Sequence, residues 1–316
     1  RLRLDPADRE DSRLGRVDDR GELVDPEHPE VGDGEGRPRV LVGLELPFPR
    51  ALGEVCDVIV TCLPSPAASA AVAEGEDGFL PVMRPGQVWM EMSTTDYEEV
   101  IRLGAAVTRQ GAIFMECPVS GGCHRADTGN ISIFAGGPRE GFDTVLPLLK
   151  LMGRRILHTG ELGTASQLKV MTNYLCTVHL VALAEALTTC KAAGLDMNTT
   201  YEAIRISSGN SFVHETESQV ILNGSRDINF TMDLVSKDIG LFDEMAQENN
   251  VPLELSPLIV RLFKEARAQY GDREFSPNII RRYEEPLGLK VLGTGFPDQM
   301  VDDEPEETGY EVVPRR

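Results

Sequence analysis

Residues 55–64 read VCDVIVTCLP, a short apolar run rich in valine and isoleucine that ends at Pro64. Such a run is typical of a strand buried on both faces in a parallel sheet. Helix-like stretches at 66–83 and 96–110 alternate with it and with the next runs, which predicts crossover helices. The further strand-like runs are QVWMEMSTT at 87–95, AIFMECPVSGG at 112–122 and ISIFAGG at 131–137.

Beyond Gly163 the pattern becomes helical. Thr164-Ala-Ser-Gln167 has the form of a capping box, and no Gly or Pro follows before Gly194, which predicts one long helix that is apolar on almost all faces. We therefore expect an α/β fold in which a parallel-sheet domain precedes an all-helical domain. The expected domains are 1–163 (with 1–50 atypical), 164–285, and an acidic tail at 286–316. Further helices are expected at about 198–207, 211–223, 231–249 and 254–270.

Composition excludes some classes of function. The 316 residues include 31 Lys and Arg against 51 Asp and Glu, a formal charge of −20, which argues against duplex nucleic acid or an anionic membrane as main partner. No uninterrupted apolar stretch has the length of a membrane span and the start has no hydrophobic signal segment, so we expect a cytoplasmic protein. Six scattered cysteines without a CxxC pair indicate neither a disulfide framework nor a metal site.

Lys169 is an unusual residue for so apolar a helix, because burying an ammonium group is costly unless it is paired or its pKa falls. Asn173 lies one turn further along the same helical face. A lysine with an amide beside it suits the handling of a proton on a hydroxyl or carbonyl group. The alternative is a lysine that reaches solvent from the first turn of the helix.

Ser120, Gly121 and Gly122 follow a strand end, where open α/β sheets place their ligands. Two glycines let backbone N–H groups approach an anion such as a carboxylate, although a plain glycine turn is the alternative. His124 and Arg125 come next, and either add positive charge to that pocket or lie exposed in a loop.

Two other polar stretches have ordinary alternatives as well. Thr94, within Ser93-Thr94-Thr95, supplies a hydroxyl at the same edge of the sheet, or belongs to a helix cap. Lys237-Asp238 lies in a helical stretch, where an exposed ion pair is the simplest interpretation.

Taken in order, these segments resemble the 3-hydroxyisobutyrate dehydrogenase family, the β-hydroxyacid dehydrogenases related to 6-phosphogluconate dehydrogenase. The resemblance runs from about residue 55 to about residue 285. It rests on DVIVTCLPSP, EMSTTD, FMECPVSGG with TGNISIFAGG, GELGTASQLKVMTN, and SKDIGL. It implies a Rossmann-like dinucleotide-binding domain and NAD or NADP as cofactor. The long apolar helix in addition favours a homodimer or homotetramer, since a single helical domain would hardly bury all its faces.

The resemblance also implies roles for particular residues. Lys169 becomes the catalytic general acid and base. The substrate would be held by Ser120, Gly121, Gly122 and Asn173. The cofactor would be contacted by Leu63, Pro64, Thr94 and Lys237.

The chain departs from this family in several places. The family opens with a strand and a GxGxxG-type loop that holds the pyrophosphate on a helix N-terminus, and residues 1–50 lack it; the GDGEG at 32–36 has no strand before it. Either this segment is not the native family sequence, or dinucleotide binding has weakened. Glu91 and Glu116 stand where the family usually has Asp, and Cys-His-Arg after the glycine pair leaves the substrate open.

We therefore expect an NAD(P)-dependent dehydrogenase that interconverts a small 3-hydroxy acid and its semialdehyde, with no bound metal. The alternative is a non-catalytic helical oligomer that has lost its cofactor. A decarboxylating dehydrogenase of sugar-acid phosphates is a rival within the class, but a phosphate would call for more cations than Arg125. Lysine at position 169 disfavours the related imine reductases.

Overall fold

The computed structural model describes residues 16–17, 23–24 and 49–315. The chain divides into two compact units, Arg1–Arg39 and Val40–Arg316. In the first unit β1 (Arg16–Val17) pairs in antiparallel fashion with β2 (Leu23–Val24). The predictions for the GDGEG stretch and for most of residues 1–50 lie outside the described residues.

A largely parallel sheet forms the first half of the second unit, with the strand order β3-β4-β5-β7-β8-β9. The pairs β3·β4, β4·β5, β7·β8 and β8·β9 are parallel, whereas β7 runs antiparallel to β5 and to the short β6. The predicted α/β fold with a Rossmann-like sheet is confirmed. The strands are β3 (Val58–Thr61), β4 (Val88–Glu91), β5 (Ile113–Glu116), β6 (Val119–Ser120), β7 (Ser132–Gly136), β8 (Arg155–Gly160) and β9 (Tyr310–Glu311).

Helices cover both faces of this sheet because its strands alternate their side chains between two apolar clusters. On β4, Trp89 packs edge-on against Phe79 and Phe114, with ring centroids 4.9 and 4.8 Å away. Its neighbours Val88 and Met90 belong to the cluster on the opposite face. The helices of this half are α1 (Pro49–Val55), α2 (Pro66–Glu74), α3 (Tyr97–Arg109), α4 (Cys123–Asp127) and α5 (Arg139–Met152).

Two details of this half were predicted wrongly. The helix expected over 66–83 ends at Glu74, and a separate 3-10 turn, η2 (Leu80–Val82), follows it. Gly78 marks the break, because a Cβ there would lie 2.3 Å from the carbonyl oxygen of Ala73. Strand β3 is also not buried on both faces: Val60 is 41% exposed. Among the described strands β3 has only β4 as a neighbour.

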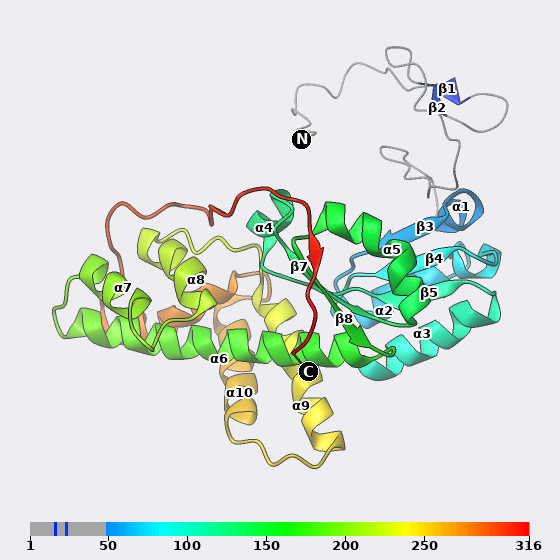
Figure 1. Ribbon diagram of the computed structural model, residues 1–316. Coiled ribbons are helices and arrows are strands. Elements are labelled where there is room, and N and C mark those ends of the chain that lie inside the picture. The colour runs from blue at the N-terminus through cyan, green and yellow to red at the C-terminus, as the bar shows by residue number, and fades with distance from the viewer. Residues whose placement is uncertain (1–15, 18–22, 25–48, 316) are drawn as a thin grey trace. The chain divides into compact units, whose positions relative to one another are not determined.

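The second half of this unit is helical, with its own apolar core. Its first element is the long helix α6 (Thr164–Ala192), which runs from the sheet to the region of α7 and α8 (Figure 1). Gly194, with a φ of +82°, follows its end, as expected for a residue after a helix C-cap. The other elements are α7 (Met197–Arg205), α8 (Phe212–Asn223), α9 (Met232–Glu248), α10 (Leu255–Tyr270), η3 (Ser276–Ile280) and α11 (Arg281–Leu287).

The cap of α6 differs from the predicted capping box. Gly163 is the N-cap residue and makes no side-chain cap. Instead, the buried carboxylate of Glu116, at the end of β5, accepts hydrogen bonds from the backbone N–H groups of Ala165 (3.0 Å) and Ser166 (2.9 Å), and from the Ser166 hydroxyl. A negative charge suits the positive end of the helix dipole. A strand residue fifty positions away therefore anchors the helix that carries Lys169.

Among the described residues, α6 is the one helix that is long and apolar enough to cross a membrane, with a mean hydropathy of 1.4 over its most apolar window. It packs against β7, α8, α9 and η3. Those contacts are typical of the core helix of a folded domain, so we do not interpret α6 as a span.

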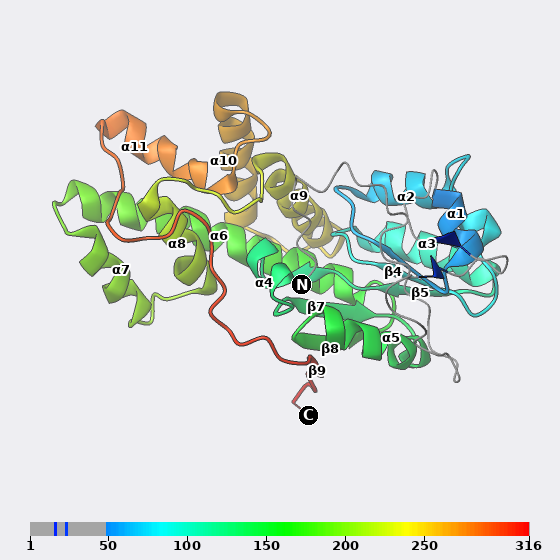
Figure 2. The ribbon, with the colours of Figure 1, turned by 90° about the horizontal axis from the view of Figure 1, so that it is seen from above.

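The residues after α11 extend back across this unit to the sheet, where β9 adds to the edge of β8 (Figures 1 and 2). No helix was expected in this tail, and none is present between Gly288 and Arg315. The tail therefore ends as the outer strand of the sheet.

We expect Glu116→Ala to destabilise the protein by about 3 kcal/mol, because two helix N–H groups and one hydroxyl lose a buried charged acceptor. Urea unfolding followed by circular dichroism measures the free energy. Glu161→Ala, at an exposed acidic residue beside the same helix start, is the matched control. Equal stability of the two variants would contradict the assigned cap.

Candidate active site

The carboxyl ends of β3 and β4 meet at one edge of the sheet and are held together by side-chain hydrogen bonds. The backbone N–H of Leu63 donates to the hydroxyl of Ser93 at 2.6 Å. The buried Glu91 carboxylate accepts from the Ser93 N–H at 2.8 Å and from the Thr61 hydroxyl at 2.9 Å. Glu91 thus organises the edge where parallel sheets bind their ligands.

A chain of polar contacts links this edge to the helical half. The Nζ of Lys169 donates to the Oδ1 of Asn173 at 2.8 Å, and the Nδ2 of Asn173 donates to Asp238 on α9. The same Asp238 carboxylate forms an ion pair of 2.8 Å with Lys237. Lys237 donates in turn to the carbonyl oxygen of Thr94 at 2.9 Å. The structure therefore brings Lys169, Asn173, Lys237 and Thr94 together.

Lys169 is buried, with only 8% of its surface exposed. Burial lowers its pKa below the usual value, and the nearby carboxylate of Asp238 opposes that shift. A lysine whose ammonium form is disfavoured gives up its proton more easily, which is what an acid–base group at neutral pH requires. The alternative of a lysine that reaches solvent does not agree with this burial.

The sequence did not predict the burial and the bridging contacts of Asp238. An exposed ion pair was the simplest interpretation of Lys237-Asp238, but Asp238 is 3% exposed and bridges Lys237 to Asn173. The local pattern gave no signal for this burial, because the partner Asn173 lies 65 residues earlier in the chain. Asp238 is thus a site residue that sequence reasoning missed.

The glycine pair adopts backbone conformations that disfavour other residues. Gly121 has a φ of +134° and Gly122 a φ of +85°, between β6 and the short helix α4. A Cβ on Gly122 would lie 3.0 Å from the His124 ring. In the described part of the chain, neither glycine N–H donates to a backbone carbonyl. An anion-binding role for these two N–H groups stays a prediction from the sequence.

Cys62, directly after β3, shows that these parts converge. Its exposed thiol interacts electrostatically with Glu91, Lys169, Cys123 and Lys237. Burial is the largest cause that raises the pKa of Cys62, and Glu91 adds to it. Residues from β3, α4, α6 and α9 therefore share one neighbourhood, which includes the residue next to the glycine pair. All six cysteines are free.

Arg125 does not supply a free positive charge to this neighbourhood. Its guanidinium forms ion pairs with Asp302 (3.8 Å) and Glu304 (3.4 Å) of the C-terminal tail, and lies over the ring of Phe212 at 4.8 Å. His124 is half-buried, and burial lowers its pKa, which disfavours the charged ring. His124 and Arg125 are therefore neither exposed loop residues nor two free positive charges.

Another buried acid lies on α8, next to a residue further along α6. Glu217, on α8, accepts a hydrogen bond from the Cys176 thiol at 3.8 Å, and its other carboxyl oxygen has no partner in the described structure. Burial raises its pKa from 4.5 to about 8. Burial therefore favours the neutral form of the Glu217 carboxyl group. Nothing in the local sequence distinguished it from a surface glutamate.

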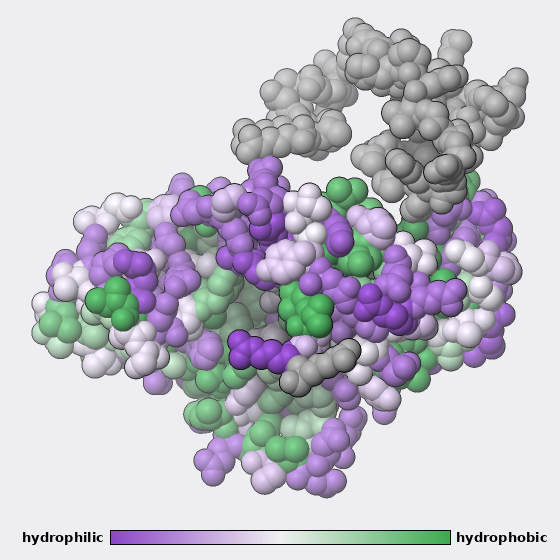
Figure 3. Space-filling view, viewed as in Figure 1, coloured by the Kyte–Doolittle hydropathy of each residue, from purple (hydrophilic) through white to green (hydrophobic). Residues whose placement is uncertain are grey.

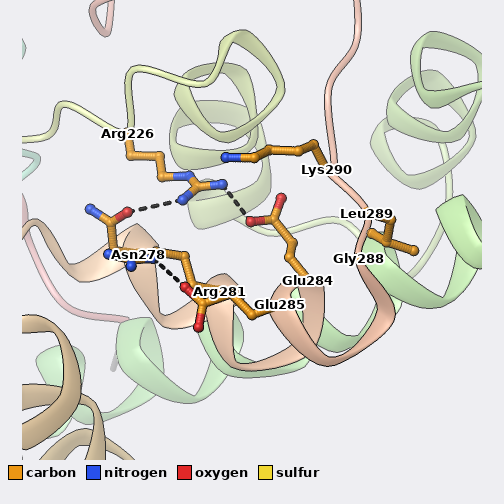
Figure 4. Close-up of a pocket in the computed structure, with 8 residues that line it drawn as sticks. All are labelled: Arg226, Asn278, Arg281, Glu284, Glu285, Gly288, Leu289 and Lys290. Carbon is orange, nitrogen blue, oxygen red and sulfur yellow. Dashed lines mark hydrogen bonds and ion pairs between the residues drawn. The ribbon is translucent and has the colours of Figure 1, made fainter.

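Two cavities lie apart from this neighbourhood. One of about 520 Å³ lies in the helical half, where Arg226 bonds to Asn278 and Glu284, and Arg281 to Glu285 (Figure 4). The other, of about 280 Å³, lies among α3, α6 and α9 and is lined by several acidic side chains. Neither cavity includes Lys169 or the glycine pair, and no group of three His, Cys, Asp or Glu in the described residues fits a metal ion.

Comparisons with known families agree with this architecture. A model of the NAD binding domain of 6-phosphogluconate dehydrogenase matches residues 46–160. A model of the NAD-binding domain of NADP-dependent 3-hydroxyisobutyrate dehydrogenase matches residues 163–283. The two matches define the class as dehydrogenases that use NAD or NADP.

Individual proteins narrow the class to a family. The chain is 32% identical over 238 residues to 2-(hydroxymethyl)glutarate dehydrogenase of Eubacterium barkeri, covering 75% of this chain and 79% of that protein. It is 30% identical over 248 residues to mitochondrial 3-hydroxyisobutyrate dehydrogenase of Mus musculus, covering 76% and 74%. A crystal structure of 3-hydroxyisobutyrate dehydrogenase from Salmonella typhimurium superposes with a TM-score of 0.68 at 26% identity, covering 74% and 82%. The chain belongs to the 3-hydroxyisobutyrate dehydrogenase family of NAD(P)-dependent hydroxyacid dehydrogenases.

The buried Glu217 predicts a specific dependence of stability on pH. Because its pKa is raised on folding, its contribution to stability is complete below the unfolded pKa and is lost as the pH rises toward about 8. We expect the wild type to lose a few kcal/mol relative to Glu217→Gln between roughly pH 5 and pH 8. Urea unfolding at the two pH values measures this.

Glu248→Gln, at an exposed glutamate of α9, is the control for that experiment. It should follow the wild type at both pH values. Parallel pH profiles for the wild type and Glu217→Gln would show that the carboxyl is not buried in its neutral form.

Proposed function

We propose that this chain oxidises a small 3-hydroxy acid to its semialdehyde, or catalyses the reverse reduction, with NAD or NADP. The observation that carries the proposal is the buried Lys169, which is hydrogen-bonded to Asn173 and interacts electrostatically with Cys62 after β3 and with Asp238 and Lys237 on α9. The two relatives support the substrate class, since both named acids carry a hydroxymethyl group on the carbon next to a carboxylate. These comparisons do not favour the alternative of a non-catalytic oligomer.

The described residues suit a bound dinucleotide. Parallel sheets bind nucleotides at the ends of their strands, and Leu63, Pro64 and Thr94 lie there. Leu63 and Thr94 are half-buried, and Pro64 is exposed. Lys237 donates a hydrogen bond to the Thr94 carbonyl oxygen beside them. NAD or NADP, when bound there, would accept or donate the hydride.

The chemistry of the substrate falls to the chain's own groups. Backbone N–H groups of Gly121 and Gly122, with the Ser120 hydroxyl, would hold the carboxylate. In oxidation the neutral Lys169 Nζ would take the hydroxyl proton while the carbinol C–H bond breaks with loss of hydride. In reduction the ammonium form would return a proton to the carbonyl oxygen. Asn173, held by Asp238, would keep the Nζ aimed at that oxygen.

The first experiment is binding of NADH and NADPH to the whole chain, followed by nicotinamide fluorescence, and then a screen of 3-hydroxy acids. Saturable binding and turnover support the proposal. A folded protein that binds neither cofactor would refute it.

We expect Lys169→Ala to lower kcat for hydroxy-acid oxidation by at least about a hundredfold, with the Kd for NADH nearly unchanged. The wild-type oxidation rate should rise with pH to a limit below the ordinary lysine pKa of 10.5, and the reduction rate should fall over the same range. Lys191→Ala, near the other end of α6, is the matched control. Retained turnover in Lys169→Ala would exclude this lysine as the acid–base group.

We expect Lys237→Met to raise the Kd for NADH or NADPH by roughly tenfold, since a charge-assisted hydrogen bond beside the cofactor edge is lost. Fluorescence titration measures the Kd, and thermal unfolding confirms that the variant is folded. Lys264→Met, at an exposed lysine of α10, should bind the cofactor normally. An unchanged Kd in Lys237→Met would separate this lysine from the cofactor site.

The oligomeric state and the cellular location of the protein are also proposals. Leu168 and Leu175 lie two turns apart on α6 and are 37% and 44% exposed, which favours a contact between copies of the chain. We infer a homodimer or homotetramer in the cytoplasm, with a small carboxylate as the binding partner and neither nucleic acid nor membrane.

A further inference from the structure

The C-terminal strap, defined here as residues 293–313, lies beyond both matched family models, which end at residues 160 and 283. It begins on the helical half. The Gly293 N–H donates to the carbonyl oxygen of Leu222 at 2.9 Å, and Asn198 exchanges two hydrogen bonds of 2.8 and 3.0 Å with the backbone of Thr294. The ring of Phe296 meets Tyr201 edge-on at 5.1 Å. These contacts fix the start of the strap on α7 and α8.

The strap ends on the sheet half. The N–H groups of Tyr310 and Val312 donate to the carbonyl oxygens of Arg154 and Ile156 at 3.0 and 2.7 Å. Glu311 pairs with Arg139 on α5 at 2.7 Å. Gly309 lies so close to the end of α5 that a Cβ there would lie 1.9 Å from a carbonyl oxygen. The strap therefore connects the two halves by a second route besides α6.

Between these anchors the strap crosses the segment that follows the glycine pair. The Asp302 side chain, 3% exposed, accepts hydrogen bonds from the Thr128 hydroxyl (2.5 Å) and the Asn130 amide (2.7 Å), and pairs with Arg125. The Asn130 amide also donates to the Glu304 carbonyl at 2.8 Å. In Figure 3 hydrophilic side chains gather along this crossing, over α4. One carboxylate thus holds three residues of the segment 125–130.

The strap also passes near Gly122. The methyl group of Met300 would lie 3.5 Å from a Cβ on Gly122. Burial acts to raise the pKa of Asp302, but the hydrogen bonds from Thr128 and Asn130 outweigh it and lower the pKa. The carboxylate is therefore ionised at neutral pH, and together with Glu304 it neutralises Arg125 beside the glycine pair.

We propose that Asp302 is a positioning residue for substrate binding: through Arg125, Thr128 and Asn130 it holds the Ser120–Gly122 segment in the conformation that receives the substrate carboxylate. This inference rests on the proposed function. The constraint consists of the contacts that Asp302 makes with this segment. It comes from the strap, which lies outside the segments that the family models match. Asp302 does not touch the reacting atoms, so its effect falls on substrate binding.

The test compares Asp302→Ala and Asp302→Asn with Glu311→Ala, which breaks a strap ion pair to Arg139 on α5. We expect Asp302→Ala to raise the KM for the 3-hydroxy acid about tenfold, with a much smaller change in kcat and an unchanged Kd for NADH. Asp302→Asn, which keeps an acceptor but not the charge, should lie between it and the wild type. Glu311→Ala should keep the wild-type KM.

A second measurement does not depend on turnover. Amide hydrogen exchange of residues 120–130, followed by mass spectrometry, should quicken in Asp302→Ala and stay unchanged in Glu311→Ala. Equal exchange in the two variants, an unchanged KM in Asp302→Ala, or a KM that rises equally in both would overturn the proposal. A wild-type chain that turns over no hydroxy acid would instead refute the proposed function, and exchange would still decide whether the strap orders the segment.

Discussion

The buried carboxylate of Glu116 is the contact on which the candidate site depends. It accepts from the first N–H groups of α6, so the end of β5 determines where the helix starts and hence where Lys169 and Asn173 lie. Only Cys117, Pro118 and Val119 separate Glu116 from Ser120. One carboxylate therefore positions both the helix that bears Lys169 and the strand that leads to the glycine pair. If this buried helix N-terminus had no cap, several of its backbone N–H groups would have no hydrogen-bond acceptor.

Charge balance in the site follows from a second buried acid. Asp238 is shared by Lys237 and, through Asn173, by Lys169. Two lysines and one carboxylate leave Lys169 without a full counter-charge of its own, and burial therefore prevails and lowers its pKa. Had Asp238 contacted Lys169 directly, the ammonium form would have been stabilised, and a smaller fraction of the lysine would be in the neutral form that can accept a proton. The Asn173 amide between Asp238 and Lys169 therefore fixes the position of the lysine without placing the full carboxylate charge beside it.

The sequence predicted those features that depend on local periodicity. The runs at 55–64, 87–95 and 112–122 each contain a strand, and the long helix ends at the expected glycine. What could not be predicted depends on contacts between distant residues. The cap of α6 comes from fifty positions away, the burial of Asp238 depends on α6, and β9 joins β8 from the end of the chain. Lys169 and the glycine pair were singled out from their residue types and positions, but their alternatives stayed open until the family resemblance assigned them roles, because the local pattern does not distinguish a catalytic lysine from one that reaches solvent.

Arg125 illustrates how such a distant contact changes a chemical conclusion. Beside two glycines it has the sequence context of an anion-binding cation, and a phosphate-bearing substrate would need such charges. The strap removes that option, because Asp302 and Glu304 pair with the guanidinium and Phe212 covers it. In the proposed function, neutral donors would then hold the anion, namely the N–H groups of Gly121 and Gly122. Neutral dipoles suit a singly charged carboxylate better than a phosphate dianion, whose desolvation they repay less well. Under the proposed function, the ion pairs of Arg125 with the C-terminal strap are therefore an argument for a simple hydroxy acid rather than a sugar-acid phosphate as substrate.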